Sequence, residues 1–443
     1  MAKIPKPTAW IELISDDLIK RAANSPALEE LLHKAQKNYL YWDTFKYQTI
    51  PAGFTKEEAW AYLKLRRSSL SQRTPVKSTT GKLFEFAVVN TLYQKLNFID
   101  THAASFIKTT KLSDTQKNKF IIAGLTEEAI ATSQIEGANT SRKVAKELLR
   151  SQRPARTKDE QMIVNSYEMM QKLTEWKNLD LSEDMLLEIQ TIVTNKTFDD
   201  NHDQGRFRTD ADEIVVKDPV TNEIVHTPPV EKDMHSELKK LIEFANKPEV
   251  EEDGDFIHPV VKAIILHFWI AYLHPFVDGN GRTARAVFHW YLLKHDYWLV
   301  QYLAISRAIV HSRKKYDNVF IYSENENDLT YFISYIADSF KTAINKFLEY
   351  FNEKMQEAEN LKLVAYKFDD YNPRQIALLQ YFLDNKNYTS TEVTIHQSKH
   401  GFHAQTAYND LVYLVDKGLL VQVSKKRKHI FMPNIQAIKK LFK

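Results

Sequence analysis

The sequence predicts a mainly α-helical protein with more than one domain. Apolar residues recur at helical spacing through most of the chain, above all in Pro259 to Leu273 and Arg282 to His295. Strand signals are few and short, with one hairpin near residue 220 and another near the C-terminus. A length of 443 residues exceeds what one hydrophobic core usually supports, so we expect two or three domains.

The composition is that of an ordinary globular protein, and it excludes several classes of function. Hydrophobic residues make up 43% and charged residues 26%, and the net charge of +3 is too small to indicate nucleic acid by itself. No cysteine occurs, which excludes disulfides and thiolate catalysis. Residues 1–10 contain no apolar run, so we expect no signal peptide, no membrane span and a cytoplasmic location.

The first 110 residues are expected to be mostly helical. Helices are predicted at Pro26 to Tyr41 and Lys56 to Arg67, and a breaker region at Ser71 to Lys82. This part indicates no particular chemistry. Its large aromatic side chains are expected to lie in the core rather than on a binding platform, and these are Trp42, Phe45 and Trp60.

A long helix is predicted from Thr115 to about Gln134. Gly137 suits the left-handed position that follows a helix, and Thr140 or Ser141 suits the N-cap of the next one. Glu136 therefore lies at the negative end of the first helix, where a carboxylate is unfavourable. We therefore expect a positively charged group near Glu136 that compensates its charge.

Two core helices and a hairpin are expected next. Lys158 to Trp176 and Ser182 to Val193 show helical apolar spacing. Residues 213–216 and 223–226 are β-type runs separated by a turn at Asp218 to Asn222, which predicts a β-hairpin in an otherwise helical region.

The most informative stretch gathers a histidine, a carboxylate, two glycines and two arginines within twelve residues. It reads His274-Pro275-Phe276-Val277-Asp278-Gly279-Asn280-Gly281-Arg282-Thr283-Ala284-Arg285. The chain has only 10 glycines, yet two of them flank one asparagine. We therefore expect a backbone with positive φ or a close approach to a ligand at this point.

The start of the helix after this loop is predicted to bind an anion. Arg282 and Arg285 lie near the positive end of the helix dipole, which costs a few tenths to ~1 kcal/mol each unless an anion is present. Backbone N–H groups of Gly279 to Arg282 would point at the same place, so a triphosphate fits. Asp278 would then supply an oxygen ligand for Mg²⁺, and His274 is the candidate general base.

A purely structural interpretation of the same stretch has to account for each residue separately, whereas one phosphate site accounts for all of them. The stretch also resembles a known family. It matches the His-Pro-Phe-x-Asp-Gly-Asn-Gly-Arg-x-x-Arg signature of Fic (Fido-fold) proteins at every position, and the likeness is strongest over about residues 120–320.

The resemblance implies a Fic-type helical core that transfers AMP from Mg·ATP to a hydroxyl of a target protein. It implies that His274 deprotonates the hydroxyl and that Asp278 holds the metal. Gly279, Asn280 and Gly281 would form the anion-binding loop, with Arg282 and Arg285 on the phosphates. Phe276 would anchor the loop in the core.

The segment Thr132-x-x-x-Glu136-Gly137 resembles the inhibitory motif of the same family, in which a glutamate lies beside the ATP site and pairs with the second arginine. The implied inhibitory helix spans about residues 115–137. Independently of the family, the misplaced charges of Glu136 and Arg285 have opposite signs and would offset each other if paired. A surface glutamate followed by a turn is the alternative.

The predicted hairpin corresponds to the family's flap, which holds the target segment as an added strand. The implied docking residues are Ile214, Val215, Val216, Ile224, Val225 and His226. A hairpin that only covers the core stays open as an alternative. Ser306 to Tyr322 resembles the family's following helix but departs from its adenine-pocket pattern, so only Tyr316 carries over as an adenine contact.

A long helix from Leu329 to Tyr366 should end before Pro373, which marks a domain boundary. After this boundary, the sequence predicts helices at Arg374 to Leu383 and Ala404 to Asp416, and two strands that flank the basic turn Lys425 to Lys428. This order is similar to a winged helix, whose partner is either DNA or a docking protein. The predicted domains are residues 1–110, 111–370 and 371–443.

Together these features predict a self-inhibited protein adenylyltransferase with ATP and Mg²⁺ as cofactors. Its partner would be a target protein with an acceptor hydroxyl. Three alternatives remain: a phosphotransferase, a de-adenylylating hydrolase, and a DNA-binding regulator whose core senses nucleotide. Self-association into a homo-oligomer is left open.

Overall fold

A computed structural model confirms a mainly α-helical protein. It describes residues 4–7, 9–104, 112–198, 201–218, 221–248, 256–365, 370–384, 389–400, 403–425 and 428–442. The chain forms two compact units, Met1–Asn345 and Lys346–Lys443, and helix α16 (Thr330–Ala365) belongs to both. The predicted N-terminal region and most of the predicted core therefore lie in one unit.

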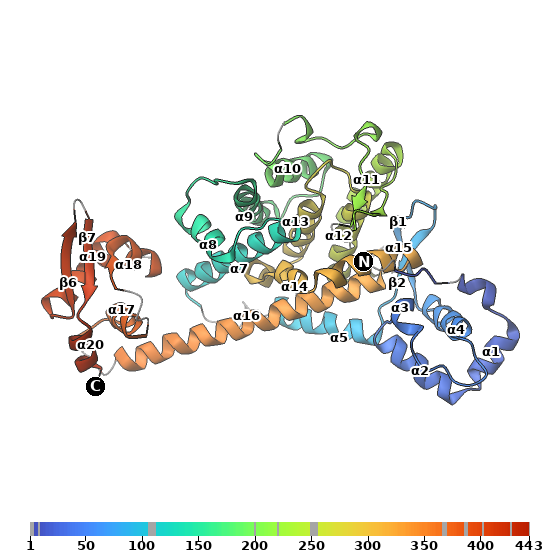
Figure 1. Cartoon of the computed structure of the whole chain (residues 1–443), viewed down its shortest axis with the longest axis horizontal. Helices are drawn as coiled ribbons and strands as arrows, with labels where there is room; N and C mark the ends of the chain where they lie inside the picture. The colour runs from blue at the N-terminus through green and yellow to red at the C-terminus, as the bar shows by residue number, and fades with distance from the viewer. Residues whose placement is uncertain are drawn as a thin grey trace. The chain divides into compact units, whose positions relative to one another are not determined.

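Two helices form the centre of the first unit, α12 (Pro259–Leu273) and α13 (Asn280–Lys294), which pack against each other (Figure 1). Nearly every side chain of both is buried. Helix α12 is apolar around most of its circumference, as expected for a central helix, whereas α13 also buries polar side chains, among them Arg282, Arg285 and His289. The bounds of α12 are those predicted. Helix α13 begins two residues earlier than predicted, so Arg282 lies in its first turn but Arg285 in its second.

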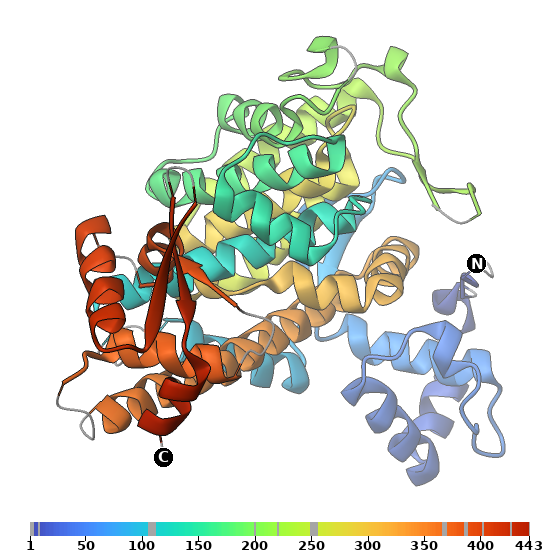
Figure 2. The ribbon, with the colours of Figure 1, turned by 60° about the vertical axis from the view of Figure 1, so that its left-hand side comes forward.

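Four more helices surround this pair, and in Figure 2 they are the cyan to yellow-green ribbons around the yellow centre. Helix α9 packs against its neighbours α7 and α10 and against α13, and α11 packs against α12. Their bounds are α7 Asp114–Ile135, α9 Lys158–Trp176, α10 Glu183–Thr194 and α11 Glu231–Asn246. The sequence predicted the first three to within two residues at each end.

The turn after α7 has the predicted geometry. Glu136 is the C-cap of the helix, and Gly137 follows in the left-handed conformation with φ of +97°. Of the two predicted N-caps it is Ser141 that accepts a hydrogen bond, from Val144 N at 3.4 Å, and starts α8 (Arg142–Ser151).

The described residues of the N-terminal part form five α-helices, of which the sequence predicted the second and the fourth, and a β-hairpin that it did not predict. Its helices are α1 Asp16–Ala23, α2 Pro26–Lys37, α3 Trp42–Phe45, α4 Lys56–Ser68 and α5 Asn90–Ile99. In the predicted breaker region, β1 (Gln72–Lys77) pairs antiparallel with β2 (Leu83–Phe86). The two strands are short, and they bury alternate side chains such as Val76 and Phe84. The predicted core positions of Trp42, Phe45 and Trp60 are confirmed.

Two predicted elements differ in length from the structure, one a helix and the other a β-hairpin. The predicted helix at Ser306 to Tyr322 is two helices, α14 (Ile305–His311) and α15 (Arg313–Glu326), broken at Ser312. The predicted hairpin is present but shorter, with β3 (Val216–Lys217) antiparallel to β4 (Ile224–His226). Short helical turns complete the unit at Trp10–Leu13, Asp100–Ala104, Asn201–Asp203, Asp210–Asp212 and Trp298–Tyr302.

The second unit contains the C-terminal helices and a three-stranded antiparallel sheet of order β5-β7-β6. Its elements are α17 Pro373–Asp384, β5 Thr391–Glu392, α18 Val393–His400, α19 Ala404–Asp416, β6 Leu420–Lys425, β7 Lys428–Pro433 and α20 Ile435–Leu441. Leu379, Leu411 and Phe431 are fully buried in its core. Elements β5, α18 and α20 were not predicted, and residues 426 and 427 of the predicted basic turn lie outside the described residues. The winged-helix assignment stays a prediction.

Across the described ranges, no helix has both the length and the apolar character needed to cross a bilayer.

Buried charged side chains connect the N-terminal helices to the core. Lys64 of α4 lies 2.8 Å from Glu326 at the end of α15 and 3.6 Å from Asp328, and all three side chains are nearly inaccessible. Tyr39 also donates to Asp328 at 2.7 Å.

We expect Lys64→Ala to destabilise the protein strongly, because it leaves two carboxylates buried without their cation. Loss of one partner of a buried ion pair typically costs ~3–5 kcal/mol. Lys34→Ala is the matched control, since Lys34 and its partner Glu30 are about 70% exposed, and an exposed pair contributes ~0–1 kcal/mol. Urea denaturation of both variants measures the difference. Equal effects would mean that the N-terminal helices are not held by this pair.

Candidate functional site

The loop between α12 and α13 is held rigidly by its own side chains. Phe276 is fully buried and stacks on Phe207 with ring centres 5.4 Å apart. The amide of Asn280 both accepts from the backbone N–H of Phe276 at 2.9 Å and donates to its carbonyl at 2.8 Å. The side chain of Asn280 is thus a clamp for the loop, and only its backbone is left to face a ligand.

Arg208 fixes the position of the loop's first residues. Its side chain is 4% exposed, and its Nε donates to the carbonyl of His274 at 2.7 Å while its backbone N–H donates to Pro275 O at 2.9 Å. His274 has a φ of +47°, an uncommon conformation for a residue with a side chain. Holding its carbonyl therefore fixes the direction of the imidazole.

His274 is oriented and neutral, as a general base must be. Its Nδ1 lies 3.2 Å from the carbonyl of Ala271. Because a carbonyl only accepts, Nδ1 carries the hydrogen and Nε2 keeps a lone pair. Burial lowers the pKa of His274 to about 4, although the hydrogen bond to Ala271 acts in the opposite direction. At pH 7 the ring can therefore accept a proton at Nε2.

The two glycines of the loop are required for different reasons. Gly279 has a φ of +90°, and a Cβ there would also strike Thr194 of α10. Gly281 is helical, but a Cβ on it would collide with the carboxylate of Glu136. An anionic oxygen thus lies directly over the first turn of α13, where backbone N–H groups have no partner within the helix.

The structure brings Glu136 and Arg285 together. Glu136 Oε1 lies 2.7 Å from Arg285 Nη2, and Arg285 also donates to the hydroxyl of Thr132 at 2.6 Å and to its carbonyl at 3.2 Å. Burial acts to raise the pKa of Glu136, but the charges of Arg285 and Arg282 outweigh it and lower the pKa. The carboxylate therefore stays ionised over the site.

Asp278 and Arg282 form a second pair, with 3.2 Å between Arg282 Nη2 and either carboxylate oxygen. Arg282 also donates to the carbonyl of Val193, and its side chain is 2% exposed. The Asp278 side chain is 42% exposed and presents hard oxygen donors, which fits Mg²⁺ bound through one carboxylate and substrate phosphates. Among the residues described here, no group of three or more carboxylates and imidazoles could hold a metal by itself.

Tyr316, the predicted adenine contact, lies in an aromatic cluster. Its side chain is 5% exposed and packs with His267, Phe320 and Phe332. Its hydroxyl lies 3.0 Å from His267 Nε2 and also interacts with the Arg285 side chain. The contact of Tyr316 with adenine stays a prediction.

The hairpin presents two of its six predicted docking residues to solvent. Ile224 is 58% and Val225 40% exposed. Ile214 and Val215 precede β3 instead of belonging to it, because Glu213 turns the chain with a φ of +49°. Val216, which begins β3, is only partly exposed.

His226 was predicted as a docking residue but is an anchor. Its Nδ1 lies 2.9 Å from Glu324 Oε2 and its Nε2 2.7 Å from the carbonyl of Tyr272. Both partners are acceptors, so the imidazolium form, in which both ring nitrogens donate, satisfies both contacts. Burial by itself would lower the pKa of His226, but Glu324 raises it above the ordinary value of 6.5.

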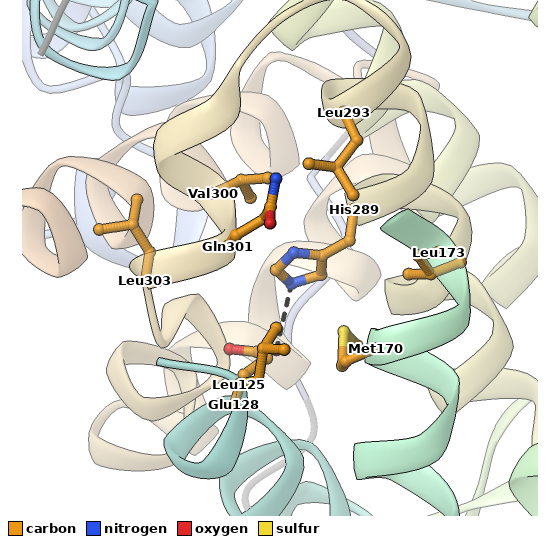
Figure 3. A pocket seen from close by; sticks show the side chains of 9 residues that line it. All are labelled: Leu125, Glu128, Met170, Leu173, His289, Leu293, Val300, Gln301 and Leu303. Atoms are coloured by element: carbon orange, nitrogen blue, oxygen red, sulfur yellow. Dashed lines mark hydrogen bonds and ion pairs between the residues drawn. The ribbon is translucent and has the colours of Figure 1, made fainter. Parts of the chain in front are cut away.

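Sequence reasoning missed three residues that support the site. Arg208 is one of them, and Arg313, which donates to the carbonyl of Ile135 at the end of α7, is another. The third is Glu128, which is fully buried, lies beside His289 of α13 and lines a small cavity (Figure 3). A signal existed for Glu128, since it precedes Thr132 by four residues and Glu136 by eight.

Residues 180–292 match the model of the Fic/DOC family. The chain is 25% identical over 145 residues to a protein adenylyltransferase Fic from Nematostella vectensis, covering 32% of this chain and 29% of that one. It is 31% identical over 123 residues to a protein adenylyltransferase Fic from Drosophila virilis, covering 28% and 23%. The chain thus spans under a third of the length of these relatives.

Among solved structures, a variant of Fic-1 from C. elegans is similar in fold, with a TM-score of 0.50 and 19% identity. The likeness covers 80% of this chain and 91% of that one.

We expect His226→Gln to destabilise the protein in a pH-dependent way. Because the pKa of His226 is raised in the folded protein, the imidazole contributes its full stabilisation of the folded state below pH 6.5. This contribution is lost as the pH rises through the raised pKa. The difference in unfolding free energy between the parent and His226→Gln should thus be largest at acidic pH and narrow toward alkaline pH. Urea denaturation at several pH values measures it, with His202→Gln as control because His202 is 77% exposed. A difference in unfolding free energy that does not change with pH would contradict a positively charged His226.

Proposed function

We propose that this chain, whose residues 180–292 match the Fic/DOC family model, transfers AMP from Mg·ATP to a hydroxyl of a target protein and that Glu136 restrains the reaction. One observation carries the proposal. A neutral, oriented His274 lies at the entrance to a helix N-terminus whose anion position is taken by a carboxylate. The names of the curated relatives, protein adenylyltransferase Fic, support the same reaction.

In the proposed reaction His274 Nε2 takes the proton of the target hydroxyl, and the hydroxyl oxygen attacks the α-phosphorus. The bond from that phosphorus to the β-phosphate oxygen breaks, and pyrophosphate leaves. Arg282, Arg285 and the first-turn N–H groups of α13 would hold the phosphates by charge and hydrogen bonds. Mg²⁺ bound at Asp278 would neutralise charge on the leaving phosphates.

Restraint by Glu136 follows from the same geometry. A γ-phosphate that needs Arg285 has to displace the carboxylate or bind in a shifted pose, with its α-phosphate poorly aligned for in-line attack. The ion pair also favours restraint over the de-adenylylating alternative, because a carboxylate held by an arginine is less free to orient a water.

The role of His274 is tested by His274→Ala. We expect AMP transfer to fall by ~10²–10⁴, the usual cost of losing a general base, while ATP binding is kept. Asp278→Ala serves as the contrasting variant, since it should weaken Mg²⁺-dependent nucleotide binding and transfer together. Incorporation of α-labelled AMP and calorimetric ATP binding separate the two effects. Transfer at the parent rate by His274→Ala would overturn the assignment of the base.

The role of Glu136 is tested by four variants. Glu136→Gly should raise AMP incorporation well above the parent, and Glu136→Asp, one methylene shorter, should raise it less. Arg285→Ala should be inactive with or without Glu136→Gly, because its phosphate contact is lost in either background. A Glu136→Gly variant no more active than the parent would refute self-inhibition and leave the catalytic assignment intact.

A further inference from the structure

We propose that Gly124 and Glu128 are positioning residues that set how far α7 lies along the catalytic core and thereby hold Glu136 over Gly281. The inference rests on the proposed self-inhibition and names the contacts that maintain it. Neither residue touches the phosphate position. Both would act through Glu136.

A stripe of α7 residues at four-residue spacing faces the core. It consists of Gly124, Glu128, Thr132 and Glu136, one residue from each successive turn, with Glu136 just past the helix end. Residues at this spacing share one face of a helix. Thr132 and Glu136 meet Arg285 at the site, and the other two meet the core further back, so the stripe has a regulatory end and an anchoring end.

The contact at Glu128 is buried and specific. Its carboxylate lies 3.2 Å from His289 Nε2 and accepts from Ser306 N at 2.9 Å and from the Ser306 hydroxyl. The dashed line in Figure 3 joins His289 to Glu128 among the apolar side chains of Leu125, Met170 and Leu173. Burial acts to raise the pKa of Glu128, but His289 and Ser306 outweigh it and lower the pKa. A buried carboxylate with three fixed donors tolerates little displacement.

The contact at Gly124 is steric. A Cβ at this position would overlap the backbone of Tyr302. Helix α7 therefore approaches the segment Trp298–Tyr302 more closely here than any residue with a side chain allows. This close approach needs no charge, so it locates the helix independently of Glu128.

The geometry links the anchors to the inhibitor. The two helices are antiparallel at this face, since Glu136 meets Arg285 while Glu128, two turns earlier in α7, meets His289, one turn later in α13. A slip of α7 by one residue moves every side chain ~1.5 Å along the axis. Such a shift would break the 2.7 Å bond between Glu136 and Arg285.

The test uses the full chain and α-labelled ATP with Mg²⁺, read as AMP incorporated into the protein itself. Glu128→Gln removes the charge and keeps the shape, and Gly124→Ala pushes the helix away without changing any charge. Each is made alone and together with Glu136→Gly. Glu147→Gln is the control, because Glu147 lies on the neighbouring helix α8 and its side chain and that of its partner Arg150 are 60% and 66% exposed.

We expect each of Glu128→Gln and Gly124→Ala to raise incorporation at least fivefold, the lower end of typical coupling between sites. Neither should add to Glu136→Gly, because both act through Glu136, and Glu147→Gln should match the parent. A residue needed only for folding would instead lower incorporation in both backgrounds. That result, or an equal rise for Glu147→Gln, would overturn the inference.

Hydrogen exchange of the amides of residues 125–137 provides a readout that does not depend on activity. Exchange should be faster in Glu128→Gln and Gly124→Ala than in the parent and in Glu147→Gln, and unchanged exchange would overturn the inference. If Glu136→Gly is activated and the two anchor variants are not, this inference alone fails. If Glu136→Gly is not activated, the proposed self-inhibition fails and the inference with it.

Discussion

The ion pair between Glu136 and Arg285 is the interaction on which the arrangement of the site depends. Glu136 is the C-cap of α7 and is unfavourably placed at the negative end of that helix, whereas Arg285 lies in the second turn of α13, where the helix dipole acts on it only weakly. At 2.7 Å apart they compensate each other. The same carboxylate covers Gly281. Glu136 therefore stabilises the nucleotide-free protein and occupies the anion position through one and the same contact.

The other contacts of the site hold the loop independently of this carboxylate. Asn280 ties the loop to itself through Phe276, and Arg208 holds the carbonyl of His274. None of these contacts involves Glu136. Displacement of the glutamate by a nucleotide would therefore leave the base and the helix N-terminus already in place, which is the preorganisation that catalysis requires.

The sequence predicted the parts of this account that depend on local rules. Periodicity located α12, α9 and α16, and a glycine after a misplaced glutamate located the end of α7. It could not show that His226 is buried between Glu324 and Tyr272, because those residues lie 98 and 46 positions away. Gly124 could not be recognised for the same reason, since it is required by the backbone of the distant residue Tyr302. Glu128 had a signal in its spacing from Thr132 and Glu136, but its partners His289 and Ser306 are distant too.

The most direct test of the central claim is to incubate Glu136→Gly and the parent with Mg²⁺ and ATP labelled at either the α- or the γ-phosphate. The account predicts that only the α-label enters protein, that pyrophosphate is released in equal amount, and that Glu136→Gly incorporates far more than the parent. Incorporation of the γ-label would contradict it, because the reaction would then be phosphoryl transfer on the same loop.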